Sequence, residues 1–375
     1  MDHVDIAIIG GGIAGMSVAY HLARNAPEAR VGVFEAESTL TYHTTGRSAA
    51  VFIENYGALP IRPLTVASKS FYLHLVDGPL LTVKGSLSVA RPDQIDIMDS
   101  QLAEGRIINP DIAYVSLADT VALAPYLRPE LIGAAIYEPE ASGIDVAGLH
   151  QAFVRGFRAN GGSIATTRRV DAARRVDDGW VIETTTTDVA ADVIVNAAGA
   201  WGDLVATSAG IAPIGLEPKR RTAFMINSPI AGSEHGPLVA NANHDWYTNP
   251  DGRQFLCSPA DETPSDPCDA RPEEIDIALA IDRINEATTL DIRSITSSWA
   301  GLRTFSQDRS MVIGPDPDQP TFHWCVGQGG TGIQTAPGAG QLAADLITAG
   351  SPGPSFEGLG LDLPRLLPDR FRHSG

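Results

Sequence analysis

The 375-residue chain is poor in cysteine, in basic residues and in long apolar segments. Its three cysteines, Cys257, Cys268 and Cys325, form no C-x-x-C pair and no cluster with histidine, so we expect reduced thiols and no metal site. With 27 lysines and arginines against 45 acids, the formal charge of −18 argues against nucleic acid or an anionic membrane as a partner. No apolar run approaches the roughly 20 residues that span a bilayer. No basic segment precedes an apolar core at the N-terminus, so we expect a cytoplasmic protein without a secretory signal.

The N-terminal segment carries a nucleotide-binding pattern. An apolar run at 4–9 leads into Gly-Gly-Gly-Ile-Ala-Gly at 10–15, and a second apolar run at 31–34 ends at Glu35. Glycines let the backbone approach a pyrophosphate, the helix N-terminus offers free N–H groups, and the acid accepts ribose hydroxyls. The pattern predicts a dinucleotide site, NAD or FAD, built from Gly10, Gly12, Ile13, Ala14, Gly15 and Glu35.

A second polar loop favours FAD over NAD. Tyr-His-Thr-Thr-Gly-Arg-Ser-Ala-Ala at 42–50 follows the second apolar run, where the middle section of a bound dinucleotide would lie. The hydroxyls and the guanidinium of this loop suit phosphate oxygens and a polyol chain, and its small residues allow close approach to a flat ring. An ordinary surface loop is the alternative interpretation. The predicted contacts are Thr44, Thr45, Arg47, Ser48, Ala49 and Ala50.

With four later segments, these two motifs resemble the D-amino-acid oxidase and dehydrogenase superfamily of FAD enzymes, which includes the glycine and sarcosine oxidases. The resemblance is strongest to the D-arginine dehydrogenase type and runs from about Asp5 to about residue 345. The later segments are V-I-V-N-A-A-G-A-W at 193–201, P-K-R-R at 218–221, W-A-G-L-R at 299–303 and G-Q-G-G-T-G-I-Q at 327–334.

The expected fold is α/β, with a Rossmann-like FAD-binding domain interleaved with a mixed-sheet α+β substrate domain. An apolar run at 322–326, a glycine-rich turn and a helix near 339–347 return to the nucleotide-binding part, which is therefore discontinuous. We place the FAD-binding domain at 1–80, 142–214 and 304–375, and the substrate domain at 81–141 and 215–303. The tail after about residue 350 is expected to pack loosely.

The resemblance also implies further cofactor contacts and a noncovalent FAD. Covalent sarcosine-oxidase relatives use a cysteine in the segment that matches 301–305, and this chain has none there. Gln334 would reach the pyrimidine edge of the flavin, and the helix after Gly332 would stabilise negative charge on the reduced ring. The implied contacts are Val170, Ala198, Gly199, Trp201, Arg303, Gly329, Gly330, Thr331, Gly332, Ile333 and Gln334.

The implied reaction is oxidation of a D-amino acid by hydride transfer from the α-carbon to flavin N5, giving an imine and then a 2-oxo acid and ammonia. Arg221 and Arg303 would clamp the substrate carboxylate, because a guanidinium binds a carboxylate bidentately. Tyr56 and Tyr247 would line the substrate pocket, and the Gly330 carbonyl would accept from the amine. The electron acceptor stays open between a quinone, a dye-like carrier and oxygen.

The substrate side chain is expected to be neutral, apolar or small. Val51 and Ile53 stand where arginine-active relatives carry polar groups, and Gly-Ser-Leu at 85–87 lacks their acid. Glu54 is the nearest acid that could reverse this, and His43 is interpreted as holding its neighbours. The alternatives are a glycine- or sarcosine-type amine oxidase, a 2-hydroxy-acid dehydrogenase of the same fold, an NAD-linked dehydrogenase and a non-enzymatic flavoprotein subunit.

Overall fold

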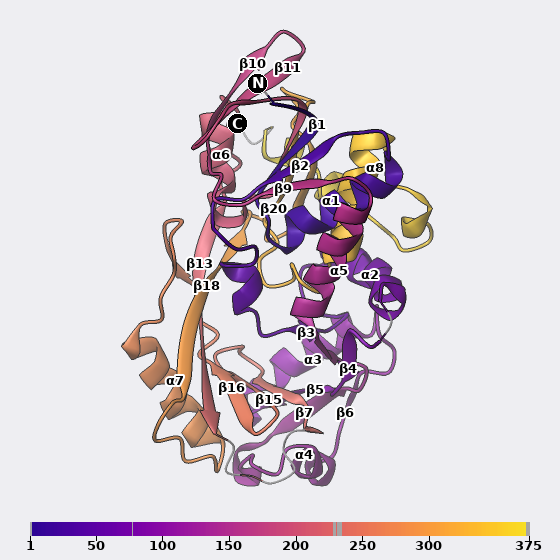
Figure 1. Ribbon diagram of the computed structural model, residues 1–375. Helices are drawn as coiled ribbons and strands as arrows, with labels where there is room; N and C mark the ends of the chain where they lie inside the picture. The colour runs from indigo at the N-terminus through magenta and orange to yellow at the C-terminus, as the bar shows by residue number, and fades with distance from the viewer. Residues whose placement is uncertain (1, 77, 228–229, 231–234, 373–375) are drawn as a thin grey trace.

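The strands gather into two large sheets at opposite ends of an elongated molecule, in a computed structural model that describes residues 2–76, 78–227, 230 and 235–372 (Figure 1). The first sheet lies in the upper part of Figure 1, with both termini, and the second in the lower part. Strands of the first sheet come from 2–34, 163–196 and 312–326, and those of the second from 86–138 and 217–305. The predicted α/β fold with two interleaved sheets is confirmed; the domain boundaries stay a prediction.

The first sheet has a parallel centre, so the carboxyl ends of its central strands meet at one edge. Its middle strand β1 pairs in parallel with β2 and β12. Residues 6–9 of β1 and all of β2 are buried, as expected of strands covered on both faces. The sheet contains β1 (Asp2–Ile9), β2 (Val31–Phe34), β9 (Ser163–Ala165), β10 (Val170–Val176), β11 (Gly179–Thr184), β12 (Val189–Asn196), β19 (Val312–Pro315) and β20 (Phe322–Val326).

Helices α1 (Ile13–Asn25), α5 (Val146–Ala159) and α8 (Ala336–Thr348) share one apolar core on this sheet. The contact between α1 and α8 is close, since a Cβ at Gly340 of α8 would lie 2.1 Å from Ser17 Oγ of α1. Helix α2 (Arg62–His74) packs on α8, while α6 (Gly202–Ser208) adds Ala206 to the core on the other face. Within the described ranges, no helix is long and apolar enough to cross a membrane.

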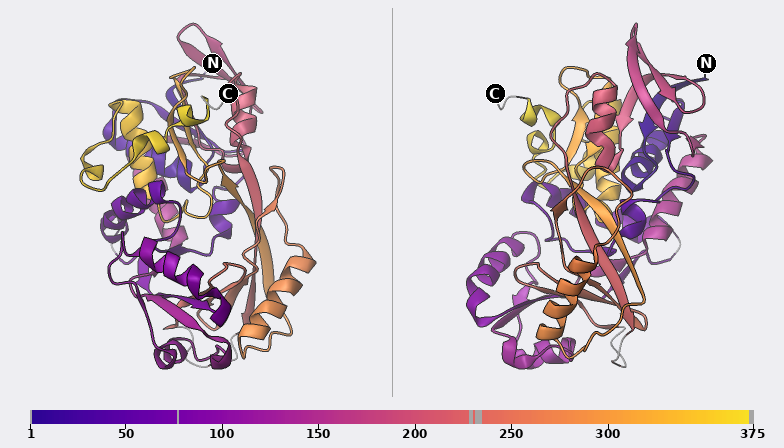
Figure 2. Two further views of the ribbon diagram at one scale, coloured as in Figure 1. Left: turned by 180° about the vertical axis from the view of Figure 1, so that it is seen from behind. Right: turned by 90° about the vertical axis from the view of Figure 1, so that its left-hand side faces the viewer.

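The second sheet is mixed, and its two longest strands reach up to the first (Figures 1 and 2). Strands β13 and β18 pair in antiparallel register from Glu217 opposite Phe305 to Met225 opposite Ser297. The strands are β5 (Ser86–Ala90), β6 (Ala113–Tyr114), β7 (Ala134–Glu138), β13 (Glu217–Asn227), β14 (Leu238–Asn241), β15 (Tyr247–Asp251), β16 (Gln254–Ser258), β17 (Thr263–Pro264) and β18 (Ser297–Phe305). The remaining helices are α3 (Ile95–Gly105), α4 (Leu117–Leu123) and α7 (Glu274–Ala287), and a small third sheet joins β3 (Val51–Phe52), β4 (Leu81–Val83) and β8 (Ser142–Ile144).

The C-terminal tail does not pack loosely, and that expectation was wrong. Phe356 and Leu366 are buried in the core around α1 and α8. The guanidinium of Arg370 donates to the Asp308 carboxylate and to the carbonyls of Ser310 and Met311. Few apolar residues suffice here, because each enters an existing core instead of building a new one.

We expect the buried His21 to make the fold acid-labile. It packs edge-on against Tyr20 and Phe71, and burial, aided by the charge of Arg24, lowers its pKa to about 3. The unfolded chain then binds more protons than the folded chain below the ordinary pKa of about 6.5, so stability is complete above that pH and falls as the pH drops toward 3. His21→Leu should flatten the decline of the unfolding free energy between pH 6.5 and 4 by up to about 1.4 kcal/mol per pH unit. An unchanged slope in denaturant titrations would contradict this assignment.

Candidate active site

A cavity of about 600 Å³ runs from the carboxyl edge of the first sheet to the β13–β18 pair. It gathers most of the predicted site residues, although they are spread over the whole chain. Those lining it are Gly10, Gly12, Ile13, Ala14, Glu35, Thr44, Thr45, Arg47, Ser48, Ala49, Val170, Ala198, Gly199, Trp201, Arg221, Tyr247, Arg303, Gly329, Gly330, Gly332 and Ile333. Gly15, Ala50, Tyr56, Thr331 and Gln334 are outside the lining.

The glycine turn after β1 forms a cradle that only glycine can form. Gly10 has φ of +107°, and a Cβ there would lie 2.6 Å from the Ala197 carbonyl oxygen. A Cβ at Gly15 would lie 2.0 Å from the Gly10 carbonyl oxygen. The N-cap residue of α1 is Gly12, which offers no side-chain cap, so the helix presents backbone to the cavity that Gly12 and Ala14 line. This arrangement fits a pyrophosphate.

Glu35 is held at the end of β2 by the backbone. Its carboxylate accepts from the amides of Gly11 at 2.7 Å and Glu37 at 2.9 Å. The remaining lone pairs of the two oxygens are free to accept from ribose hydroxyls at the cavity wall. His43 bonds to the Glu37 carboxylate at 2.9 Å, and its ring packs at a tilt against Trp201 with 4.7 Å between ring centroids, so it holds its neighbours.

The 44–50 loop connects the two sheets through its side chains. Arg47 Nη1 donates to the carbonyls of Ala270 and Ala300, each at 2.9 Å, and Arg47 Nη2 pairs with Asp269 at 2.5 Å. The expected contact between this guanidinium and phosphate is therefore not supported, because its terminal nitrogens bind the protein. Thr44 Oγ1 likewise donates to the Leu302 carbonyl at 2.8 Å, whereas Thr45 Oγ1 accepts from the Ile13 amide at 3.0 Å.

Gln334 is also held by contacts within the protein. Its side-chain amide donates to the Tyr56 carbonyl and Thr65 Oγ1, and its oxygen accepts from the Ile53 amide. Gln334 is 3% exposed, and its side chain secures the segment around Tyr56; its contact with the flavin stays a prediction. Thr331 is similarly turned inward, with Oγ1 donating to the Gln328 carbonyl.

Two arginines on one face of the β13–β18 pair form the far end of the cavity. Arg221 lies opposite Gly301 and Arg303 opposite Lys219, so both side chains project from the same face of the ladder. Arg303 Nη1 donates to the Tyr56 hydroxyl at 3.1 Å. Burial, and then the charge of Arg303, lowers the pKa of Arg221, and the charge of Arg303 lowers that of Tyr56. Two cations on one face at the end of one cavity suit an anionic ligand.

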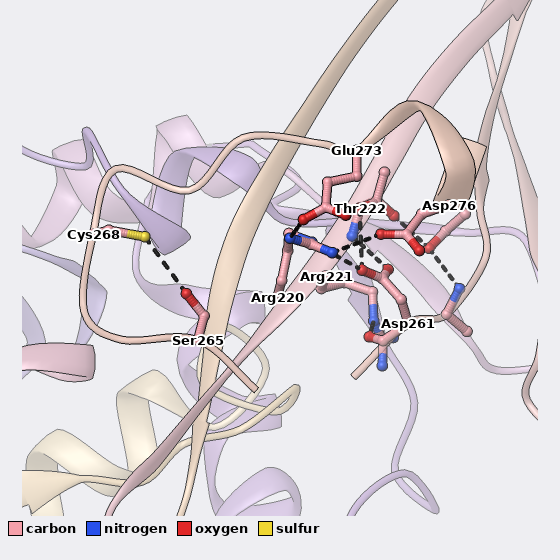
Figure 3. Close-up of polar contacts among 10 residues, drawn as sticks. Arg220, Arg221, Thr222, Asp261, Ser265, Cys268, Glu273 and Asp276 are labelled. Carbon is pink, nitrogen blue, oxygen red and sulfur yellow. Dashed lines mark hydrogen bonds and ion pairs between the residues drawn. The ribbon is translucent and has the colours of Figure 1, made fainter. Parts of the chain in front are cut away.

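Arg220 points to the opposite face, as the strand alternation predicted. It forms ion pairs with Glu273 and Asp276 of the α7 region on the outer side of β13 (Figure 3). The neighbouring arginines of β13 therefore have different surroundings, one structural and one in the cavity.

The sequence interpretation missed the acid nearest to the clamp. Glu54 is paired with Lys69 at 2.9 Å, and residues 85–87 include no acid. Glu262 instead approaches Arg221 Nη2 at 3.3 Å and binds Arg309 through both of its oxygens. The available signal was Asp-Glu at 261–262, shortly after the end of β16 at Ser258, but acidic pairs in surface connections are common.

Residues 5–346 match the model of the family DAO, described as FAD dependent oxidoreductase. The chain belongs to this family. FAD is therefore its cofactor, and the glycine cradle, Glu35 and the elongated cavity fit that molecule. The superfamily part of the resemblance is confirmed, while the D-arginine dehydrogenase type is not specifically supported.

Similar proteins of this family span nearly the whole chain. FAD-dependent oxidoreductase domain-containing protein 1 of Bos taurus is 26% identical, over 92% of this chain and 81% of its own length. Glycine oxidase of Geobacillus kaustophilus is 24% identical, over 92% of both chains. The structure of L-proline dehydrogenase from P. horikoshii superposes with a TM-score of 0.85 at 19% identity, covering 99% of this chain and 98% of that one.

We expect acid precipitation to release the FAD from this family member. Cys325 precedes the glycine-rich segment at 327–332. It is fully buried, and burial raises the pKa of its thiol to about 12. Such a thiol supplies no thiolate for attachment to the ring. Mass spectrometry of the denatured chain should give the mass of the polypeptide alone, and a mass increased by one flavin would contradict the prediction.

Proposed function

We propose that the protein oxidises the α-carbon–nitrogen bond of a D-amino acid that carries a neutral, apolar or small side chain. When bound, FAD would accept the two electrons. The resulting imine takes up water and releases a 2-oxo acid and ammonia. The observation that carries the proposal is the pair Arg221 and Arg303, set on one face at the end of the FAD cavity beside Gly330.

The local geometry supports a carboxylate at this position. A Cβ at Gly330 would lie 2.8 Å from both Arg303 Nη1 and the Tyr56 hydroxyl, so only a glycine at 330 lets these two side chains approach the backbone that closely. Tyr247 lines the same end of the cavity from β15. The arginines would hold the carboxylate and thereby orient the α-carbon toward the cofactor.

Charge pairing supports a substrate without a cationic side chain. Glu54 is neutralised by Lys69, and Glu262 by Arg309 and Arg221. A buried ammonium or guanidinium without a carboxylate of its own costs several kcal/mol. The similarity to glycine oxidase favours a second candidate, a glycine- or sarcosine-type amine oxidase.

Anaerobic bleaching of the flavin absorbance tests the proposal. The panel contains D- and L-methionine, D-leucine, D-phenylalanine, D-arginine, D-lysine, glycine, sarcosine and a 2-hydroxy acid. We expect the second-order rate constant of flavin bleaching for the apolar D-amino acids to exceed that for D-arginine and D-lysine at least tenfold, or about 1.4 kcal/mol. A preference for the basic pair would overturn the side-chain assignment, and a preference for glycine or sarcosine would favour the second candidate.

The electron acceptor and the location are also proposals. We propose a cytoplasmic enzyme that passes its electrons to a quinone, a dye-like carrier or oxygen. Peroxide release in air, compared with dye reduction under nitrogen, separates an oxidase from a dehydrogenase.

A further inference from the structure

Two consecutive acids, Asp261 and Glu262, hold β13 from its two faces. The Asp261 carboxylate accepts from the amide of Thr222 at 2.6 Å and from its hydroxyl at 3.1 Å (Figure 3). The Asp261 carbonyl accepts from Arg221 Nε at 2.7 Å. Glu273 and Asp276 form ion pairs with Arg220, so the outer side of β13 is fixed as well.

Glu262 acts on the cavity side of the same strand. Its Oε1 accepts from Arg221 Nη2 at 3.3 Å and from Arg309 Nη2 at 2.8 Å, while Oε2 accepts from Arg309 Nη1 at 3.0 Å. Arg309 in turn lies over the Phe305 ring, 4.0 Å from its centroid. The carboxylate is thus fixed bidentately by one arginine before it meets the other.

Among the residues that the structure describes, these contacts leave one edge of Arg221 for a ligand. A guanidinium has five N–H donors in a rigid plane. The Asp261 carbonyl takes Nε–H and Glu262 takes one hydrogen of Nη2, so the terminal Nη1–Nη2 edge keeps its donors on a side chain that lines the cavity. This is the edge that binds a carboxylate end-on with two hydrogen bonds.

We propose that Glu262, held by Arg309, is the positioning residue that orients Arg221 toward the substrate carboxylate. The inference rests on the proposed function, because it requires a carboxylate-bearing substrate. The Arg221 side chain is 12% exposed and that of Glu262 is 32% exposed, so the contact lies where the cavity wall meets solvent. Without Glu262, the guanidinium can rotate about its Nε anchor and present a single donor.

The experiment uses the FAD-loaded enzyme and its best panel substrate, with propionate as a carboxylate that cannot be oxidised. Glu262→Ala should raise KM and the propionate inhibition constant about tenfold or more, with kcat changed less than about threefold, since ground-state positioning is lost. Glu262→Gln should restore both constants to within about threefold of wild type, because its amide oxygen still accepts from Arg221. A merely structural residue would change thermal stability without this division between KM and kcat.

Two further variants complete the test. Arg309→Ala should raise KM by a smaller factor, and the double variant should be no worse than Glu262→Ala, because both act on one contact. Glu273→Ala is the matched control on the outer face, with unchanged kinetic constants. Wild-type kinetic constants for Glu262→Ala would overturn this inference but not the proposed function. Tighter propionate binding in both the Ala and Gln variants would do the same, because Glu262 would then compete with the ligand for Arg221. A wild-type enzyme that oxidises no carboxylate-bearing substrate would overturn the proposed function and, with it, the inference.

Discussion

Replacing Arg303 or Arg221 with alanine should lower kcat/KM for the preferred substrate by roughly 10²–10⁴-fold while FAD stays bound. Truncating one partner of a desolvated charge pair costs about 2–5 kcal/mol, and misplacement of the reacting carbon adds to the loss in rate. Both side chains lie on the same face of the β13–β18 pair and line the far end of the cavity. The measurement is steady-state kinetics together with the absorbance ratio of flavin to protein.

Lys219→Ala is the matched control for this loss. Lys219 projects from the same face, opposite Arg303, but it pairs with Glu217 and lies over the Phe305 ring. We expect kcat/KM of the Lys219→Ala variant to stay within about threefold of the wild-type value. Near-normal kcat/KM in either arginine variant would make that arginine structural. Arg303→Lys should be intermediate, because it keeps the charge but loses the planar pair of donors.

Gly15→Ala should abolish stable retention of FAD and lower the stability of the fold. The added methyl group would lie 2.0 Å from the Gly10 carbonyl oxygen and 3.3 Å from the Ile8 side chain. The nearer contact is with backbone, so relief requires α1 to move away from the turn, at a cost on the order of 3 kcal/mol. Flavin content after gel filtration and the thermal midpoint of the holoenzyme measure the two effects.

Gly11→Ala is the control that distinguishes the backbone clash at position 15 from the effect of replacing another glycine of the same turn. Its methyl group would meet Leu40 Cδ2 at 2.3 Å, which is the movable end of a side chain. We expect a smaller loss of stability and partial retention of flavin. If Gly15→Ala kept one FAD per chain with an unchanged midpoint, close contact between the turn and α1 would not be essential.

The cofactor half of the site could be predicted because its signals are local. A strand, a glycine turn and a terminal acid each follow from a few adjacent residues, and the parallel sheet brings them to one edge. Other predicted cofactor contacts involve side chains that meet distant segments of the chain. Arg47 meets Asp269, 222 positions away, and Gln334 meets Ile53, 281 positions away. A single sequence carries no signal for such pairs, so the sequence interpretation gave both side chains cofactor roles and missed these contacts within the protein.

Glu262 shows the same limit on the substrate side. An acid that shares two arginines looks in the sequence like any solvated residue of a connection, since its partners stand 41 and 47 positions away. The tail was misjudged for a related reason. Its proline and glycine content describes the local backbone, whereas its order comes from Arg370 and the core that receives Leu366.

The pairing of β5 with β14 constrains how this architecture can diversify in evolution. These central strands of the second sheet come from two separate stretches of the chain, and Leu238 of one lies opposite Ser86 of the other. Transfer of one contiguous gene segment would therefore bring in only part of the sheet and leave an unpaired edge, which invites aggregation. Point substitutions within either stretch avoid this problem, because they leave the β5–β14 pairing intact.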